Sequence, residues 1–212
     1  ATVIARLTAK AGFPLQAYED VILGSTNQAG EDSRNVARYA ALLAGLPIET
    51  GGQTVNRLCA SGLAAVIDAA RAISCGEGDL YIAGGVEMMG RVAMGSDGAA
   101  IAVDPSLAMK TYFVPQGISA DIIATEYGFT REQADAFAVE SQQRAAQAWK
   151  DNRFAKSIVP VKDQNGLTIL DRDEYMRPGT DLAALAKLEP SFKAMGEVMP
   201  GFDKIAMMKY PH

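Results

Sequence analysis

A strand followed at once by a helix is predicted by the stretch Thr54-Val55-Asn56-Arg57-Leu58-Cys59-Ala60-Ser61-Gly62-Leu63. Thr54 and Val55 suit a short strand, and from Cys59 to Ser74 nearly every residue is small or apolar. A helix that is apolar nearly all round is usually buried, so we expect this one in the core of a domain. Cys59 therefore lies where a strand ends and a helix begins.

Helices and short apolar strands alternate on both sides of this junction. We expect one helix at Ala1–Ala11 and another that runs from the cap Ser33 through Ala44. Buried strands are expected at Val21–Gly24 and Leu80–Ala83. This alternation is typical of an α/β layered domain with a largely parallel sheet.

The residue pattern changes after Gly85, and we predict two domains, 1–90 and 91–212. Between Gly90 and Gly117 the chain has no clean period, which is uncommon in a compact domain unless the segment is functional. Later helices are expected at Ala120–Tyr127, Thr130–Trp149 and Leu182–Leu188. The second of these helices begins with a capping box of Thr130 and Gln133, and a hairpin is expected from Ser157–Val161 and Leu167–Leu170 around Asn165-Gly166.

Composition narrows the class of protein. The chain has 212 residues, 49% of them hydrophobic and 21% charged, as in ordinary soluble globular proteins. A net charge of −5 argues against nucleic acid as a partner. We see no apolar run long enough to span a bilayer and no signal peptide, so we expect no membrane partner. Two cysteines are too few for a disulfide framework, which favours free thiols in the cytosol or an organelle matrix, and we expect a cytoplasmic location.

Cys59 is the candidate nucleophile. The amino end of a helix offers free amide groups and a positive dipole end, and both stabilise a thiolate. The small residues Ala60, Ser61 and Gly62 leave room for an electrophile. On position alone a small buried core cysteine is an equally good interpretation of Cys59. Cys75 is predicted near the opposite end of the same helix, about 24 Å away, so the pair cannot form a disulfide.

The residues do not supply an obvious base. The single histidine is His212, the last residue, and the chain opens in the middle of a helical pattern. We therefore expect a chain truncated at both ends, with an incomplete catalytic apparatus and no turnover by these residues alone.

The stretch Asn56-Arg57-Leu58-Cys59-Ala60-Ser61-Gly62-Leu63 is similar to the thiolase signature around the acyl-enzyme cysteine. The resemblance continues along nearly the whole chain. Further segments that resemble thiolases are Asn35-Val36-Ala37-Arg38, Ala44-Gly45-Leu46-Pro47, Ala83-Gly84-Gly85-Val86-Glu87-Met88-Met89, Gln116-Gly117-Ile118-Ser119-Ala120, Tyr127-Gly128-Phe129-Thr130-Arg131, Arg177-Pro178-Gly179-Thr180 and Leu185-Ala186-Lys187-Leu188-Glu189-Pro190-Ser191-Phe192. The chain thus resembles the amino-terminal half of a thiolase together with its loop domain.

This resemblance implies a thiolase-like layered α/β fold with a mostly parallel sheet and an inserted α+β loop domain that binds coenzyme A. It implies acyl transfer between coenzyme A thioesters, with acetyl-CoA or another acyl-CoA as substrate, no permanently bound cofactor and no metal. Cys59 is matched to the acyl-accepting residue. The residues matched to substrate binding are Arg177, Ala184, Leu188 and Gln116. A homodimer or tetramer is also implied.

Departures from the family pattern leave alternatives open. The family's first strand, its active-site histidine and its second cysteine are not matched, and Met88 and Gly90 replace usual serines. A non-catalytic acyl-CoA-binding or partner subunit is therefore an alternative to an enzyme. A ketoacyl synthase-like condensing enzyme is a third possibility, which the signature around Cys59 fits less well. For Arg177 taken alone, a solvated loop arginine is the simpler interpretation.

Overall fold

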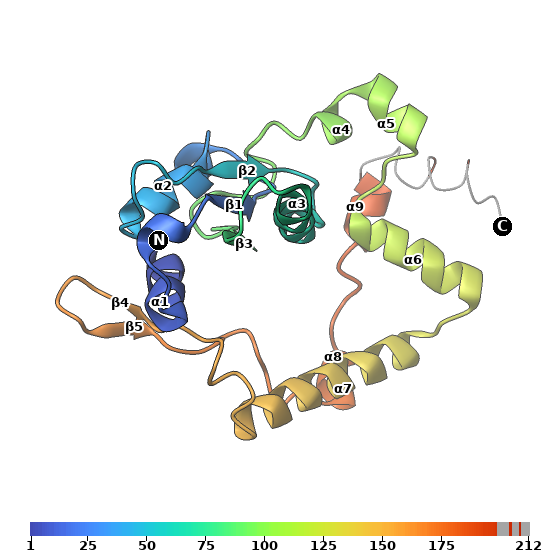
Figure 1. Ribbon diagram of the computed structural model, residues 1–212. Helices are drawn as coiled ribbons and strands as arrows, with labels where there is room; N and C mark the ends of the chain where they lie inside the picture. Colours follow the sequence, from blue (N-terminus) through green and yellow to red (C-terminus); the bar gives the residue numbers. More distant parts are fainter. Residues whose placement is uncertain (199–203, 205–207, 209–212) are drawn as a thin grey trace. The chain divides into compact units, whose positions relative to one another are not determined.

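The computed structural model describes residues 1–198, 204 and 208, and the chain divides into two compact units. The first unit is Ala1–Ala99 and the second begins at Ala100 (Figure 1). Each unit is described by itself below.

A parallel sheet organises the first unit. Strand β1 (Asp20–Gly24) lies in the middle and pairs in parallel with β2 (Gln53–Val55) and with β3 (Tyr81–Gly85). Ile22 lies opposite Gln53 on one side. The residues of β1 from Val21 onward are buried, as is usual for a parallel strand covered on both faces. The prediction of a mostly parallel α/β sheet is confirmed.

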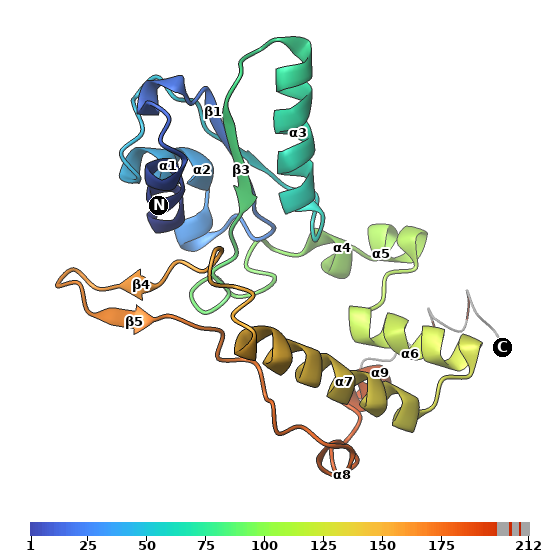
Figure 2. The same ribbon diagram turned by 60° about the horizontal axis from the view of Figure 1, so that its bottom comes forward.

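Helices cover both faces of this sheet. Helices α1 (Thr2–Ala11) and α2 (Val36–Leu43) pack on one face, and α3 (Ser61–Cys75) packs on the other (Figure 2). The first core contains Ile4, Tyr18, Val21, Leu23, Ala37, Ala41, Leu46 and Ile82. The second, smaller core is formed by Ile22, Ala65 and Ala69. Alternate residues of β1 thus point to opposite cores, as the pleat of a strand requires.

The cap of α2 differs from the prediction. Asn35, not Ser33, is the cap residue, and its Oδ1 accepts a hydrogen bond of 3.2 Å from the Arg38 amide. Asn35 Nδ2 also donates to the Gly52 carbonyl at 2.7 Å, and its Oδ1 accepts from the Thr54 hydroxyl at 3.0 Å. The Ser33 prediction was wrong because the cap is chosen by contacts with β2 as well as by the local pattern.

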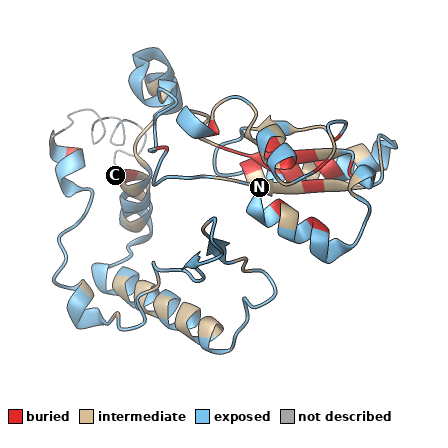
Figure 3. Ribbon diagram, turned by 90° about the vertical axis from the view of Figure 1, so that its left-hand side faces the viewer, coloured by how far each residue is buried: buried red, intermediate tan, exposed pale blue. Residues whose placement is uncertain are grey.

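Helix α3 is not buried all round. Its small residues Ala64, Ala65 and Ala69 face the sheet, whereas Leu63 is 64% exposed and Val66 is 50% exposed. In Figure 3 the buried residues gather in the first unit, on its strands and on parts of its helices. The expectation of complete burial was wrong for this chain, because the residues described cover one face of the helix.

The same helix corrects the prediction about membrane spans. The window Leu58–Cys75 has a mean hydropathy of 1.5 and is long and apolar enough to cross a bilayer by length and composition. The core helix of a folded domain passes the same test, and α3 packs on the sheet through its alanines. We therefore assign α3 to the sheet, and the absence of a membrane partner stays a prediction.

The second unit is mostly helical. Its helices are α4 (Ala100–Val103), α5 (Pro105–Thr111), α6 (Gln116–Tyr127), α7 (Arg131–Lys150), α8 (Leu182–Leu185) and α9 (Lys193–Val198). Strands β4 (Val161–Lys162) and β5 (Thr168–Leu170) form the predicted antiparallel hairpin, with the first strand shorter and later than expected. Helices α4 and α5 were missed, although Asp104 followed by Pro105 is a cap signal for α5.

Helix α7 begins as predicted and shows one half-buried face. The Thr130 and Gln133 capping box is present, with hydrogen bonds of 3.3 Å and 2.9 Å. The half-buried residues recur at helical spacing and include Asp135, Val139, Gln142 and Trp149, while no residue of α7 is fully buried. This face of α7 packs on other parts of the second unit, and α8 is among its contacts.

Asp20 makes the stability of the first unit depend on pH. Burial raises the pKa of Asp20 above its ordinary 3.8, although the Val21 amide and the Arg38 charge act to lower it. The folded state therefore holds the proton more tightly than the unfolded state. The contribution of Asp20 to stability is complete below pH 3.8, the ordinary pKa of the group. It is lost as the pH rises through the higher pKa that Asp20 has in the folded state.

Asp20→Asn should therefore be more stable than the parent at neutral pH, since the amide needs no desolvation of a charge and still accepts from Val21. Urea unfolding at several pH values measures the difference. Glu49→Gln, which changes an exposed acid of the same unit, is the control and should shift stability little. A lower midpoint for Asp20→Asn at neutral pH would contradict the explanation.

Candidate active site

The carboxyl ends of the three parallel strands lie at one edge of the sheet, and Cys59 follows β2 there. At this edge Gly24 ends β1 against the start of α3. A Cβ on Gly24 would stand 2.3 Å from the Ser61 carbonyl carbon and 2.5 Å from the Gly62 nitrogen. Only glycine permits this approach, which brings the amino end of α3 onto the strand.

The turn that carries Cys59 is fixed by Ser61. The Ser61 Oγ accepts from the Arg57 amide at 2.8 Å and donates to the Leu58 carbonyl at 2.6 Å. Leu58 has a φ of 50°, in the left-handed region that is costly for a residue with a branched side chain. Cys59 itself is exposed, with Ala60 as the cap and Ser61 as the first residue of α3. It thus lies two residues before the helix, not within it as the sequence suggested.

Side chains that follow the three strands tie this turn to its neighbours. Asn56 Nδ2 donates to the Thr26 carbonyl at 3.0 Å, and Asn56 Oδ1 accepts from the Leu58 amide at 3.0 Å. The Glu87 carboxylate accepts from both the amide and the hydroxyl of Thr26. We refer to Thr26, Asn56 and Glu87 as the strand-end tie. Their polar side chains come just after the predicted strands, which is the signal that could have identified them.

Glu87 is ionised at neutral pH. Partial burial acts to raise the pKa of Glu87, but hydrogen bonds from the Thr26 side chain, the Thr26 amide and the Asn27 amide outweigh it and leave the pKa below the ordinary 4.5. A charged carboxylate is a strong acceptor, so the tie between β3 and β1 is present throughout the neutral range.

This arrangement suits a thiol nucleophile. Cys59 is accessible and lies just before the amino end of a 15-residue helix, where negative charge is favoured. A thiolate there can attack an electrophilic carbonyl carbon. Cys75 is also a free, exposed thiol, but it ends the same helix, where the dipole disfavours negative charge.

The first unit has no histidine to act as a base, and a pocket in it lies away from Cys59. In the described ranges (1–198 with 204 and 208) there is no histidine, and His212 lies outside them. Nor does this part of the chain hold a group of three or more His, Cys, Asp or Glu side chains suited to a metal. A pocket of about 570 Å³ opens at the opposite edge of the sheet and includes Cys75, but not Cys59. Its acidic lining, including Glu19, Asp20 and Asp68, would repel a phosphate-rich ligand.

The four predicted substrate-binding residues lie in the second unit. Arg177 is exposed, its amide donates to Gln142 Oε1 at 2.7 Å, and its carbonyl accepts from the Thr180 hydroxyl. Ala184 lies in α8, where its amide donates to the cap Asp181 at 2.7 Å. The remaining two are Leu188, which is 60% exposed just after α8, and Gln116, the exposed first residue of α6.

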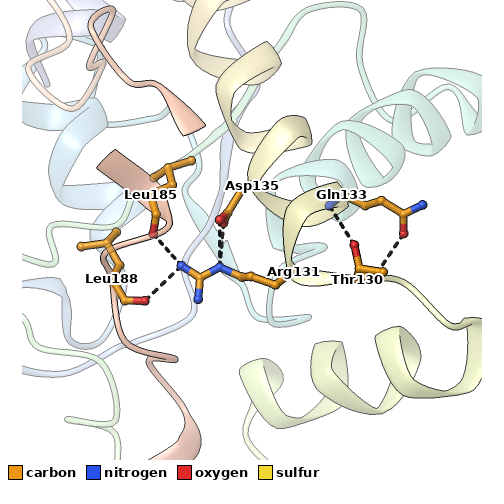
Figure 4. Close-up of polar contacts among 6 residues, drawn as sticks. All are labelled: Thr130, Arg131, Gln133, Asp135, Leu185 and Leu188. Carbon is orange, nitrogen blue, oxygen red and sulfur yellow. Dashed lines mark hydrogen bonds and ion pairs between the residues drawn. The ribbon is translucent and has the colours of Figure 1, made fainter. Parts of the chain in front are cut away.

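Arg131 holds the segment around α8, as Figure 4 shows. Its Nη2 donates to the Leu185 carbonyl at 2.6 Å and to the Leu188 carbonyl at 3.0 Å. Its Nε donates to both oxygens of Asp135 at 2.9 Å. Arg131 and Asp135 were not singled out from the sequence, although an acid four residues after an arginine is a common helical pair.

The structure therefore groups the predicted site residues in two sets. Arg177, Ala184 and Leu188 belong to segments that are hydrogen-bonded to α7 or follow such a segment directly. Gln116 begins a different helix of the same unit, and Cys59 belongs to the first unit.

Comparisons with known proteins agree with one another on the family that this chain resembles. A family model described as the N-terminal domain of thiolase matches residues 1–202. A beta-ketoadipyl-CoA thiolase of Pseudomonas aeruginosa is 45% identical over 84% of this chain and 49% of its own length. A 3-oxoadipyl-CoA/3-oxo-5,6-dehydrosuberyl-CoA thiolase of Escherichia coli K12 is 44% identical over 88% of this chain and 51% of its own. A 3-ketoacyl-CoA thiolase of Alcanivorax borkumensis is 40% identical, with coverages of 89% and 49%. The chain spans about half the length of these curated relatives.

Proposed function

The chain belongs to the thiolase family, and from this membership we propose that it is the acyl-accepting half of an enzyme that transfers acyl groups between coenzyme A thioesters. The observation that carries the proposal is the exposed Cys59 thiol, held before the amino end of α3 by Ser61 and the strand-end tie. The named activities of the relatives favour 3-ketoacyl-CoA thioesters as substrates.

In the proposed cleavage reaction the Cys59 thiolate attacks the 3-keto carbonyl carbon. The new bond joins Cys59 Sγ to that carbon, and the bond between C2 and C3 of the substrate breaks. Acetyl-CoA leaves with the electron pair and takes up a proton. Free coenzyme A then attacks the cysteine thioester, releases the shortened acyl-CoA and restores the Cys59 thiolate. The reverse sequence is a condensation of two acyl-CoA molecules.

The described residues include no histidine that could act as the base for proton transfer. We propose that the remaining half of the protein, which the relatives contain, supplies the histidine base and the second cysteine. We propose further that Arg177, Ala184, Leu188 and Gln116 of the second unit contact coenzyme A. An exposed guanidinium suits its phosphates, and exposed apolar side chains suit its pantetheine arm. A cytoplasmic homodimer or tetramer remains our expectation.

Incubation of the full gene product with acetyl-CoA, followed by intact-mass analysis and peptide mapping, tests the role of Cys59. We expect one acetyl group on the peptide that contains Cys59. Cys59→Ala should abolish the adduct, whereas the matched change Cys75→Ala should leave it unaltered. A full-length protein whose Cys59 peptide stays unmodified would overturn the enzyme proposal. The 212-residue chain alone is expected to show no turnover, because it spans only about half the length of its curated relatives.

The absence of histidine from the part of the chain that the structure describes keeps a second candidate in view. A non-catalytic thiolase-fold subunit would bind acyl-CoA without forming the Cys59 adduct. Calorimetric binding of acetyl-CoA by the full gene product without acylation is the result that would favour this candidate.

A further inference from the structure

Three polar side chains of α7 share one face of the helix. Asp135 follows Arg131 by four residues and Gln142 follows it by eleven. At 3.6 residues per turn, the three side chains project within about 40° of one another. We call Arg131, Asp135 and Gln142 the polar stripe. Asp135 and Gln142 are half-buried, so the stripe lies on the side of α7 that packs on other segments.

The stripe holds the two segments that carry the predicted coenzyme A contacts. Gln142 accepts from the Arg177 amide, and Arg131 donates to the carbonyls of Leu185 and Leu188. Those carbonyls come at and after the end of α8, where a helix has few donors left for its acceptors, and the Leu185 carbonyl also accepts from the Leu188 amide at 2.9 Å. The guanidinium fork therefore closes the carboxyl end of α8, while Asp181 caps its amino end.

Asp135 fixes the orientation of the Arg131 guanidinium group. Both of its oxygens accept from Arg131 Nε at 2.9 Å, and the Asp135 side chain is only 15% exposed. Ion pairs shielded from water are weakened less by solvent and salt than exposed ones. With Nε held by Asp135, the Nη2 group is left pointing at the two carbonyls (Figure 4).

The position of Arg131 indicates that it stabilises α8 and not α7. Arg131 is the first residue of α7, where a positive charge opposes the helix dipole. The four-residue α8 is too short to persist on its own, since isolated short helices are unstable in water. Arg131 thus places an unfavourable charge at the start of α7, and its guanidinium donates the hydrogen bonds that stabilise the carboxyl end of α8.

We propose that Arg131, oriented by Asp135, is a positioning residue for coenzyme A binding. It fixes the segment Leu182–Leu188 so that Ala184 and Leu188 are presented in one arrangement. The inference rests on the proposed function, which assigns these two residues to coenzyme A. Arg131 itself does not need to touch the ligand.

The same helix offers a matched control. Arg144 and Glu140 form another pair four residues apart on α7, and both side chains are more exposed, at 80% and 55%. Their positions lie roughly 140° to 180° around the helix from Arg131. Arg144→Gln therefore removes the same kind of charge from the same helix, but on the face away from the stripe.

The test measures coenzyme A binding and local protection from hydrogen exchange in the full gene product. Calorimetry with free coenzyme A gives the Kd, and hydrogen exchange followed by mass spectrometry reports on 182–188. Arg131→Gln should weaken binding roughly tenfold, the loss expected for removal of a charged hydrogen-bonding group, and should speed exchange in 182–188. Arg131→Lys, which keeps the charge and an ammonium donor group but not the planar guanidinium, should give a Kd between those of the parent and Arg131→Gln. Asp135→Asn should follow Arg131→Gln in direction, and Arg144→Gln should match the parent.

Two further readouts separate the possible failures. Alkylation of Cys59 by iodoacetamide and exchange within 143–150, the last turns of α7, should be equal in all variants, because general unfolding would change both. An unchanged Kd in Arg131→Gln, with the parent chain binding coenzyme A, overturns this inference alone. A parent chain that does not bind coenzyme A overturns the assignment of the coenzyme A site in the proposed function, and this inference with it.

Discussion

Gly24→Ala should destabilise the first unit by about 3 kcal/mol, near the upper end of the range for an overpacked core. The added Cβ would stand 2.3 Å from the Ser61 carbonyl carbon and 2.6 Å from the Ser61 carbonyl oxygen, both of them backbone atoms. A flexible side chain could turn aside, but here the start of α3 must move away from β1. That displacement would also move the turn at Cys59, because Ser61 holds it.

Urea unfolding followed by hydrogen exchange of β1 and α3 peptides measures this effect, since the two units need not unfold together. Gly62→Ala is the control. It lies at the same contact, but its Cβ would meet nothing within 4 Å, and alanine in a helix is favoured over glycine by roughly 0.5–1 kcal/mol. Equal stability for Gly24→Ala and the parent would show that α3 does not rest directly on the strand.

Arg38→Met should cost about 2–3 kcal/mol, the range for hydrogen bonds to a charged group and for carbonyls left without partners. The Arg38 guanidinium donates to the carbonyls of Thr50 and Ile48, and Thr50 is only 3% exposed. Methionine keeps an apolar stem of similar length and removes the donors together with the charge, as Arg71→Met does in the control. The segment between α2 and β2 should therefore loosen while α2 itself stays formed.

Thermal unfolding and exchange of residues 46–52 measure the change. Arg71→Met is the matched control, because Arg71 is 71% exposed and makes a single ion pair of 3.6 Å with Asp68. Exposed pairs of this kind contribute 0–1 kcal/mol in general, about the smallest effect that such experiments resolve. If both variants lost the same stability, the two carbonyl contacts of Arg38 would contribute no more to stability than the exposed ion pair of Arg71.

Local patterns in the sequence predicted the types of most elements. The three strands of the first unit, the capped start of α7 and the hairpin were all expected, because periodicity, caps and turn residues act within a few positions of each other. Two short helices, α4 and α5, were missed because the segment between Gly90 and Gly117 has no clean period. The family was also predicted from ordered motifs, and the comparisons confirm it.

The sequence by itself determined that Cys59 stands at a strand-to-helix junction, because a run of small apolar residues after a short strand has few other structures. Only the tertiary structure decided which partners hold it. Asn35 capped α2 in preference to Ser33, and the strand-end tie and the polar stripe joined residues distant in sequence. The physical reason is that periodicity is a property of neighbours along the chain, whereas a hydrogen-bond partner is chosen by the packing that brings two segments together.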